Sequence, residues 1–246
     1  MKILAIDIGN TFLKLGVFHN NFLLEKYVVT HSQLPETTQK INQTHPEIEK
    51  AVVCAVGRFP QNTQRTLADF WEVFKITSDF PVSFQINYET PKTLGVDRLV
   101  LAAAAYNQFP NKNVLIIDAG TCITYDFMDE HGVYQGGAIS PGVRLRYKSL
   151  NDYTQQLPLL DASAPKHLIG KSTESSIHSG VINGIVFEID GVIANYKLLY
   201  KDLTVILTGG NTDFLQDKLK NSIFANSNFL LEGLNFLSDF IKSNDI

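Results

Sequence analysis

The residues best suited to chemistry lie near the start of the chain, in the segment DIGNTFLK at positions 7–14. The apolar residues 2–6 predict a buried strand that ends at the carboxylate of Asp7, and Gly9 follows in a predicted turn. Glycine lets a backbone pass close to a ligand, and the N–H groups of such a turn can face phosphate oxygens. The segment is therefore suited to a turn that binds phosphate together with a metal ion, with Lys14 reaching back as a positive charge.

An ordinary hairpin with a solvated Asp7 explains the same segment equally well, because a short D-x-G-[NT]-T pattern has many chance matches. A second copy favours phosphate binding, since the apolar run 114–117 is followed by DAGT at positions 118–121. A third segment, VILTGGN at 205–211, is a predicted strand that runs into a Gly-Gly turn. Three such segments on one chain arise by chance far less often than one.

Segments of this kind in this order resemble the phosphate-1, phosphate-2 and adenosine motifs of the actin, heat-shock-70 and sugar-kinase ATPase superfamily. We therefore predict an α/β fold of two ribonuclease-H-like lobes, an actin-like ATPase duplication with the active site in the cleft between them. The expected lobes are 1–112, which carries the first phosphate motif, and 113–246, which carries the second phosphate motif and the adenosine motif. Alternation of strands with helices supports this fold class.

The composition narrows the possible functions. The chain has 246 residues, 44% of them hydrophobic and 19% charged, which is enough for one large or two modest cores. A net charge of −4 without any basic block disfavours nucleic-acid binding as the main role. The two cysteines, Cys54 and Cys122, indicate neither a disulfide framework nor a metal site. The N-terminal run is too short for a signal peptide, and no run approaches the ~20 apolar residues of a membrane span, so we expect a cytoplasmic protein without membrane partners.

The first half is expected to follow the ribonuclease-H-like order of strands and helices. Its expected elements are strands 2–7, 12–18 and 22–29, helix 32–42, strand 51–56, helix 61–70 and strand 73–76. The second half is expected to form strands 114–118, 122–128 and 132–138, a Gly/Pro-rich turn at 136–142, helices 143–150 and 176–200, strand 203–208, and helices 213–220 and 229–241.

The predicted helix 176–200 carries a wide apolar stripe together with Gly180, Gly184 and Gly191, which are poor helix formers. Glycines at such positions make sense where another backbone packs closely. Two interpretations stay open: close contact between this helix and a sheet of the same chain, or a subunit interface, which we slightly favour.

A further motif, GVDR at 95–98, leads into an Ala-rich predicted helix over 99–106. Asp97 falls in the first turn of that helix, where the helix dipole favours a negative charge. On local grounds alone, a simple helix-start acid with Arg98 as a surface charge is the preferred explanation.

Taken together, these residues resemble one family, the type III pantothenate kinases, over nearly the whole chain. The segments that carry the resemblance are DIGNTFLK at 7–14, GVDR at 95–98, DAGT at 118–121, GGAISPG at 136–142, LP at 157–158, GKST at 170–173, SG at 179–180 with Gly184, TGG at 208–210 and LEGL at 231–234. Several ordered motifs on one chain are far more specific than any one of them. The resemblance implies ATP-dependent phosphorylation of the primary hydroxyl of pantothenate to 4′-phosphopantothenate, the first step of coenzyme A biosynthesis.

Carried over by position, the resemblance assigns a role to individual residues, with Asp97 as the general base. The implied ATP-binding residues are Asp7, Ile8, Gly9, Asn10, Thr11, Phe12, Leu13, Lys14 and Thr121. The implied pantothenate-binding residues are Tyr88, Gly95, Val96, Asp97, Arg98 and Thr173, the last of these from the partner subunit of a homodimer. Asp118 would hold a monovalent cation, K⁺ or NH₄⁺, and Mg²⁺ would accompany ATP.

Three residues depart from the pattern of the family. His178 stands where Gln is common, Val96 where Ala is common, and Cys122 where a small residue is usual. None of these departures removes a candidate catalytic group.

The chemistry agrees with the implied roles. Phosphoryl transfer needs positioning and charge neutralisation more than covalent chemistry. A carboxylate such as that of Asp97 accepts a proton from an alcohol across a hydrogen bond of about 2.6–3.2 Å, so a helix-start acid and a general base are compatible. Arg98 offers a planar fork suited to a carboxylate or a phosphoryl oxygen, and Asp7 is expected to reach Mg²⁺ through water.

Two other functions remain as alternatives at this stage. One is an ATP-binding module that switches conformation or assists transcription, and the other is a kinase whose acceptor is a sugar or acetate. The chain length leaves no room for the large insertions of actin-like and chaperone proteins, and the motif at 95–98 argues against a different acceptor.

Overall fold

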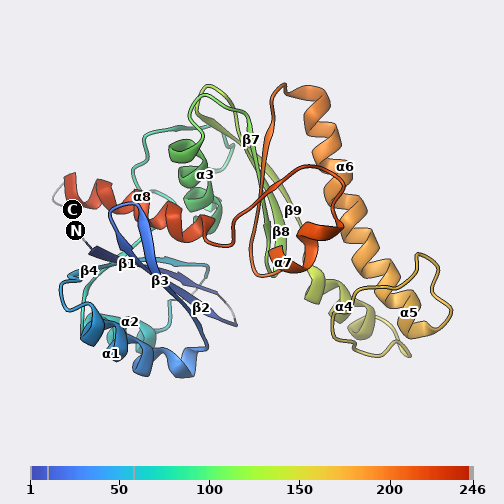
Figure 1. Cartoon of the computed structure of the whole chain (residues 1–246), viewed down its shortest axis with the longest axis horizontal. Coiled ribbons are helices and arrows are strands. Elements are labelled where there is room, and N and C mark those ends of the chain that lie inside the picture. The colour runs from blue at the N-terminus through green and yellow to red at the C-terminus, as the bar shows by residue number, and fades with distance from the viewer. Residues whose placement is uncertain (1, 10, 58, 244–246) are drawn as a thin grey trace. The chain divides into compact units, whose positions relative to one another are not determined.

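The computed structural model describes residues 2–9, 11–57 and 59–243, which form two compact units (Figure 1). Unit 1 takes in residues 1–110, 132–134 and 228–246, and unit 2 takes in residues 111–131 and 135–227. Both units combine a mixed sheet with helices, as the alternation of strands and helices in the sequence predicts.

Unit 1 is built on a five-stranded sheet with the strand order β3-β2-β1-β4-β5. The strands are β1 Lys2–Ile8, β2 Leu13–His19, β3 Phe22–Val29, β4 Lys50–Ala55 and β5 Glu72–Lys75. Strand β1 pairs antiparallel with β2 and parallel with β4. Strands β1 and β4 are nearly continuous apolar runs, which suits strands covered on both faces of a sheet.

Helices cover both faces of this sheet (Figure 1). They are α1 Leu34–Thr44, α2 Gln61–Ala68, α3 Val96–Gln108 and α8 Phe229–Ser243, with short 3-10 helices at His31–Gln33 and Pro91–Thr93. Leu34 and Ile41 of α1 and Leu67 of α2 share one core cluster with the inward residues of β1 and β2. On the opposite face, α8 packs against α3 and β1.

The last helix differs from the sequence-based expectation in its location. The sequence places 229–241 with the second lobe, whereas α8 packs within unit 1, against the first strand of the chain. Gly233 lies where α8 meets α3, because a Cβ there would stand 2.3 Å from the carbonyl oxygen of Val100. Because α8 and β1 are far apart in the sequence, no local sequence pattern predicts their contact.

Unit 2 contains β7 Val114–Ala119, β8 Cys122–Met128, β9 Val133–Pro141, β10 Thr204–Thr208 and β11 Phe224–Ala225, in the order β11-β10-β7-β8-β9. Strand β7 pairs antiparallel with β8 and parallel with β10. The first residues of β9, Val133 and Tyr134, belong to unit 1, where the short strand β6 Gln85–Ile86 pairs with them.

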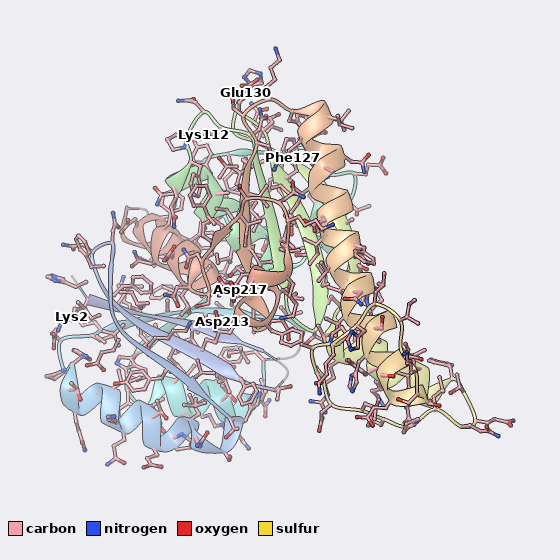
Figure 2. All side chains as sticks on the ribbon, turned by 45° about the vertical axis from the view of Figure 1, so that its right-hand side comes forward. Lys2, Lys112, Phe127, Glu130, Asp213 and Asp217 are labelled. Carbon is pink, nitrogen blue, oxygen red and sulfur yellow. The ribbon has the colours of Figure 1, made fainter. Side chains whose placement is uncertain are left out.

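The helices of unit 2 are α4 Val143–Asp152, α5 Thr173–His178, a π-helical segment Ser179–Asn183, α6 Gly184–Leu199 and α7 Thr212–Leu215, followed by a 3-10 turn Gln216–Lys218. Ile185, Ile189 and Ile193 of α6 lie in the core of the unit. Tyr200 follows α6 directly, and the centre of its ring lies 4.2 Å from the centre of the Phe127 ring. Figure 2 labels Phe127 on β8.

The composite helix Thr173–Leu199 is, by length and apolar composition alone, long enough to cross a membrane. Its most apolar window is 44% buried inside the protein, which is also the behaviour of a core helix. Glu188 and Asp190 interrupt the apolar run, which explains why the sequence shows no continuous span.

Two elements in unit 2 differ from the sequence-based expectations. The Gly/Pro-rich segment 136–142 is not a turn, because β9 continues to Pro141. Gly137 permits this, since a Cβ there would stand 1.6 Å from the carbonyl oxygen of Tyr125 in β8. The expected helix 213–220 is only the single turn α7 and the 3-10 turn that follows it.

Replacing Gly233 by Ala tests the packing of α8 on α3. The added methyl group would collide with the backbone of Val100, and overpacking of this kind lowers the free energy of unfolding by about 1–3 kcal/mol. The better helix propensity of Ala offsets about 1 kcal/mol of that loss. Urea unfolding should therefore show Gly233→Ala to be less stable than the parent chain. The matched control is Gly210→Ala, whose methyl group would meet no atom within 4 Å, and equal stability of the two variants would contradict the close crossing.

Candidate active site

The first candidate group is an ion pair where β1 ends and β2 begins. Asp7 and Lys14 are cross-strand partners, and the Lys14 ammonium lies 3.5 Å from a carboxylate oxygen of Asp7. Burial raises the pKa of Asp7, Lys14 offsets part of this increase, and the negative charge of Asp97 adds to it. Asp97 therefore lies within electrostatic range of this pair, and unit 1 brings three of the predicted site residues together.

The turn between these strands is closed by its own backbone. The N–H of Gly9 donates to the carbonyl oxygen of Phe12 at 3.1 Å, and a ring nitrogen of His31 lies 3.2 Å from the carbonyl oxygen of Gly9. Sequence reasoning missed His31, which follows β3 and carries no motif. Asn10 of the predicted phosphate motif lies outside the described residues.

The turn residues differ in what they can offer a ligand. Ile8 and Leu13 are buried in the core of unit 1, so only their backbone is available to a nucleotide. Thr11 and Phe12 are exposed, and the ring of Phe12 is half in solvent. The exposed threonine hydroxyl, the backbone N–H groups and Lys14 are therefore the groups of this turn that suit a phosphate.

The second candidate group is the start of α3. Gly95 is the residue before the helix, and Asp97 lies in the first turn with a carboxylate oxygen that accepts the N–H of Arg98 at 2.9 Å. A Cβ on Gly95 would stand 2.5 Å from the same carboxylate oxygen. Gly95 therefore gives the carboxylate of Asp97 the space it occupies. Val96, the first helical residue, is half-buried.

Arg98 is not the surface charge that the local sequence suggests. Its side chain is buried, with 4% of the residue exposed, and the guanidinium lies over the ring of Tyr88 at 5.7 Å from the ring centre. A guanidinium in this position gains from the negative face of the aromatic ring. Two residues that the resemblance assigns to pantothenate, Tyr88 and Arg98, are thus in contact.

The third candidate group is the turn between β7 and β8, in unit 2. The N–H of Gly120 donates to the carbonyl oxygen of Cys122 at 2.9 Å, and the N–H of Gly142 donates to that of Thr121 at 3.0 Å. A Cβ on Gly142 would stand 2.4 Å from the carbonyl oxygens of Gly120 and Thr121, so this glycine lets the end of β9 approach the turn. Thr121 itself remains exposed.

The predicted adenosine motif lies directly beside this turn. Both the backbone N–H and the side-chain amide of Asn211 donate to the carbonyl oxygen of Ala119, each at 3.0 Å. Gly209 has φ +98°, and a Cβ on it would stand 2.3 Å from a carboxylate oxygen of Asp118. Unit 2 therefore brings the second and third motifs together, with Asp118 of the second motif against Gly209 of the third.

Asp118 is the residue that the resemblance assigns to a monovalent cation. Within the described part of the chain, no group of three or more His, Cys, Asp and Glu side chains is arranged to hold a metal ion. A cation at Asp118 would therefore be shared with neutral oxygens, such as hydroxyl and carbonyl groups, and hard cations take oxygen ligands of these types.

Thr173 occupies the first position of α5, where it is exposed. The residue before it, Ser172, caps the helix: its hydroxyl accepts the N–H of Ser175 at 3.2 Å, and the hydroxyl of Ser175 lies 2.9 Å from the N–H of Ser172. This reciprocal pair is a capping box, which satisfies backbone donors at the start of a helix. It fixes the backbone on which Thr173 is presented.

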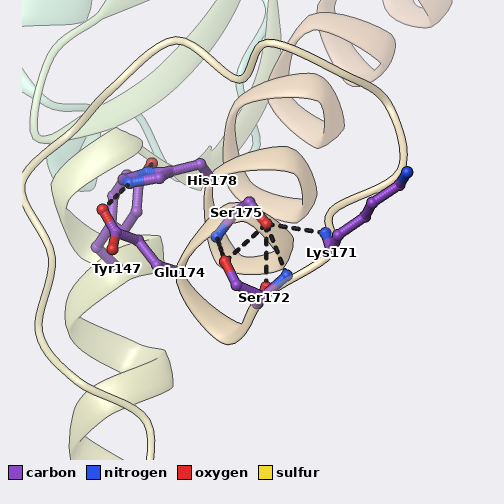
Figure 3. A network of polar contacts seen from close by, with 6 residues as sticks. All are labelled: Tyr147, Lys171, Ser172, Glu174, Ser175 and His178. Carbon is purple, nitrogen blue, oxygen red and sulfur yellow. Dashed lines mark hydrogen bonds and ion pairs between the residues drawn. The ribbon is translucent and has the colours of Figure 1, made fainter.

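His178, one of the departures from the family's pattern, joins α5 to α4 (Figure 3). Its Nδ1 lies 2.7 Å from the hydroxyl of Tyr147, and its Nε2 lies 3.6 Å from a carboxylate oxygen of Glu174. Glu174 follows Thr173 directly in sequence. The imidazole therefore helps to hold the first turn of α5 in place.

A partly buried network that sequence reasoning missed supports the end of β9. The hydroxyl of Tyr125 donates to Glu188 at 2.9 Å, Arg146 pairs with the same carboxylate, and Arg146 Nε donates to the carbonyl oxygen of Pro141 at 2.8 Å. Burial alone would raise the pKa of Glu188, but hydrogen bonds from Arg146, Ser140 and Tyr125 hold it below its usual value. The sequence feature that could have indicated this network is a charged residue, Glu188, inside the apolar run of α6.

Comparison with known proteins identifies the family of the chain. A family profile described as "Type III pantothenate kinase" matches residues 3–195. The chain is 49% identical over 240 residues to a type III pantothenate kinase from Christiangramia forsetii, which covers 98% of this chain and 99% of the relative. It is 47% identical over 243 residues to the corresponding protein from Flavobacterium johnsoniae, covering 99% and 100%.

Solved structures show the same fold at much lower identity. A Campylobacter jejuni protein assigned to the Baf family of transcriptional activators aligns with a TM-score of 0.62 and 20% identity, covering 98% of both chains. A ROK family glucokinase from Streptomyces griseus aligns with a TM-score of 0.51 and 12% identity, covering 98% and 99%. These likenesses confirm the predicted α/β fold.

One family agrees with the sequence identity over the whole length. It also agrees with the three motifs at strand ends and with the acidic residue at the start of α3. The chain belongs to the type III pantothenate kinases, phosphotransferases that use ATP to phosphorylate pantothenate in the biosynthesis of coenzyme A.

Proposed function

We propose that Asp97 is the general base of this reaction and accepts the proton of the primary hydroxyl of pantothenate. The observation that carries the proposal is the placement of its carboxylate at the start of α3, held by the N–H of Arg98 and given space by Gly95. A carboxylate has about four acceptor positions, so one bond to a backbone N–H leaves room for a substrate hydroxyl. The helix dipole favours the ionised form that a base requires.

Most of the remaining pantothenate contacts in the proposal come from residues near Asp97 in unit 1. Arg98, stacked on Tyr88, presents a fork that matches a carboxylate or a phosphoryl oxygen. Gly95 and Val96 supply the backbone at the start of α3. Thr173, exposed at the capped end of α5, is assigned to pantothenate bound by the partner subunit.

The proposed nucleotide contacts are the turn from Asp7 to Lys14 and Thr121 at the turn between β7 and β8. Lys14 provides a positive charge for phosphate, and the exposed Thr11 and Thr121 provide hydroxyls. Mg²⁺ bound with ATP would neutralise part of the phosphate charge during transfer. In the proposal, Asp7 holds that ion through water, and Asp118 holds K⁺ or NH₄⁺.

We further propose that the protein works as a homodimer, in the cytoplasm. Cβ atoms at Gly184 and Gly191 would meet no atom within 4 Å, which argues against the interpretation that these glycines admit a sheet of the same chain. On the same side of α6, at helical spacing, Phe187 is 55% exposed and Leu198 is 85% exposed. A face of small and apolar residues suits the close packing of a second copy of this helix.

Asp97→Asn tests the proposed base. The amide cannot accept the proton, and loss of a general base slows turnover by about 10²–10⁴-fold. Mass-spectrometric detection of 4′-phosphopantothenate, from purified protein with ATP, Mg²⁺ and pantothenate, should show this loss while circular dichroism stays unchanged. The matched control is Asp69→Asn, an exposed aspartate of unit 1 at the end of α2. Equal turnover in the parent chain and Asp97→Asn would exclude this residue as the base.

Asp7→Asn should separate stability from activity. Because the folded state raises the pKa of Asp7, it binds the proton more tightly than the unfolded state does. The contribution of Asp7 to the free energy of unfolding therefore falls as the pH rises from the ordinary aspartate pKa through the raised pKa of the folded state. At neutral pH, the melting temperature of Asp7→Asn should be no lower than that of the parent chain. The variant should also lose the pH dependence of stability that Asp7 causes, and it should phosphorylate pantothenate poorly. A large drop in melting temperature at pH 7 would contradict the pKa direction.

Phe187→Glu tests the homodimer. A carboxylate in the centre of the α6 face would be desolvated next to its symmetry mate, so the dimer should dissociate. Light scattering at assay concentration should give the mass of one chain for Phe187→Glu and of two chains for the parent. The control is Phe224→Glu, which is 64% exposed on β11 of the same unit but is not on α6. A parent protein with the mass of one chain would overturn the proposal.

A further inference from the structure

A row of oxygen-bearing side chains crosses the sheet of unit 2 at the level of Asp118. Thr208 of β10 pairs with Asp118 of β7, and Asp118 pairs with Thr124 of β8. Directly paired residues on neighbouring strands point to the same face of a sheet, with Cβ atoms about 4.5–5.5 Å apart. Asp118 is therefore flanked on one face by two threonines, of which Thr208 is 2% exposed and Thr124 is 7% exposed.

The hydroxyl proton of Thr124 is already used. Thr124 Oγ1 donates to Asp126 Oδ2 at 2.9 Å, and Asp126, two residues further along β8, is completely buried. A threonine hydroxyl has one proton and two lone pairs. With the proton directed to Asp126, Thr124 can offer only lone pairs to its cross-strand neighbour Asp118.

Two acceptors side by side repel each other in a buried site, because an ionised carboxylate also has only lone pairs to offer. A cation that binds both oxygens turns this repulsion into coordination. The charge of the site favours a monovalent ion, since the described residues offer no cluster of three acidic or imidazole groups here. Divalent cations in proteins are usually bound by more carboxylate oxygens than one side chain supplies.

We propose that Thr124 supplies a ligand oxygen to the monovalent cation at Asp118, and that Asp126 is a positioning residue that turns the lone pairs of Thr124 toward that ion. This inference rests on the cation site proposed above and extends it to two residues outside the four-residue DAGT motif. Asp126 acts only through Thr124, so its replacement should change cation affinity without removing a ligand atom.

The test is thermal unfolding of the purified full-length protein, titrated with KCl against choline chloride at constant ionic strength. A ligand that binds only the folded state raises the melting temperature as its concentration passes the dissociation constant. The parent chain should show a saturable rise with K⁺ that NaCl does not match. Asp118→Asn should abolish this rise, and Thr124→Val should raise the half-saturating K⁺ concentration at least tenfold. Thr124→Ser, which keeps the hydroxyl, should restore a response close to that of the parent.

Two further variants separate ligation from simple loss of packing. Thr204→Val removes a buried hydroxyl from the same face of β10 at its other end, opposite Val114, and should keep the parent's K⁺ response even if its melting temperature changes. Asp126→Asn places an amide donor beside Thr124, which turns the hydroxyl proton away and should weaken K⁺ binding as Thr124→Val does. ²⁰⁵Tl NMR of Tl⁺, a K⁺ substitute, should show the same ranking of affinities.

The outcomes distinguish this inference from the site on which it rests. A parent chain with no selective K⁺ response, or an unchanged response in Asp118→Asn, overturns the cation site at Asp118 itself. An Asp118→Asn variant that loses the response while Thr124→Val keeps it overturns only the role of Thr124. A normal response in Asp126→Asn, with a lost one in Thr124→Val, overturns only the positioning role of Asp126.

Discussion

The constraint on which both units depend is the close approach of the backbone to a carboxylate, which leaves no room for a side chain on the neighbouring residue. A glycine beside each carboxylate meets this constraint. A Cβ on Gly95 would stand 2.5 Å from an oxygen of Asp97, and one on Gly209 would stand 2.3 Å from an oxygen of Asp118. This close approach is possible only for glycine, which explains why glycines recur in motifs that otherwise differ.

The carboxylates in the two units have different polar surroundings. In unit 1, burial and the negative charge of Asp97 both raise the pKa of Asp7, and Lys14 offsets only part of this increase. In unit 2, Asp118 is the cross-strand neighbour of Thr124, whose hydroxyl proton is directed to Asp126. Burial of an ionised carboxylate such as Asp7 lowers the free energy of unfolding, which is common at functional sites and rare in a purely structural core.

Local features of the sequence predicted most of the fold and the motifs. Apolar runs that end in Asp or Gly-Gly gave the central strands, because buried strands need continuous hydrophobic residues. The errors involve contacts between residues that are distant in sequence. Arg98 is buried, with its guanidinium over the ring of Tyr88, and is not a surface charge. The segment 136–142 extends a strand because Gly137 lies against β8, and α8 packs on β1. The short strands β6 and β11 have no periodicity of their own, so only pairing with partners distant in sequence defines them. The π-helical segment is a local change within a helix that the apolar pattern of the sequence does not distinguish.

The packing of α8 on β1 has a consequence for how the protein is made. Strand β1 is synthesised before unit 2, whereas α8, the helix that packs on it, is synthesised after unit 2. While unit 2 is being synthesised, one apolar face of the unit 1 sheet therefore lacks the cover that α8 provides. Nascent chains whose cores close late expose hydrophobic surface for longer and depend more on chaperones.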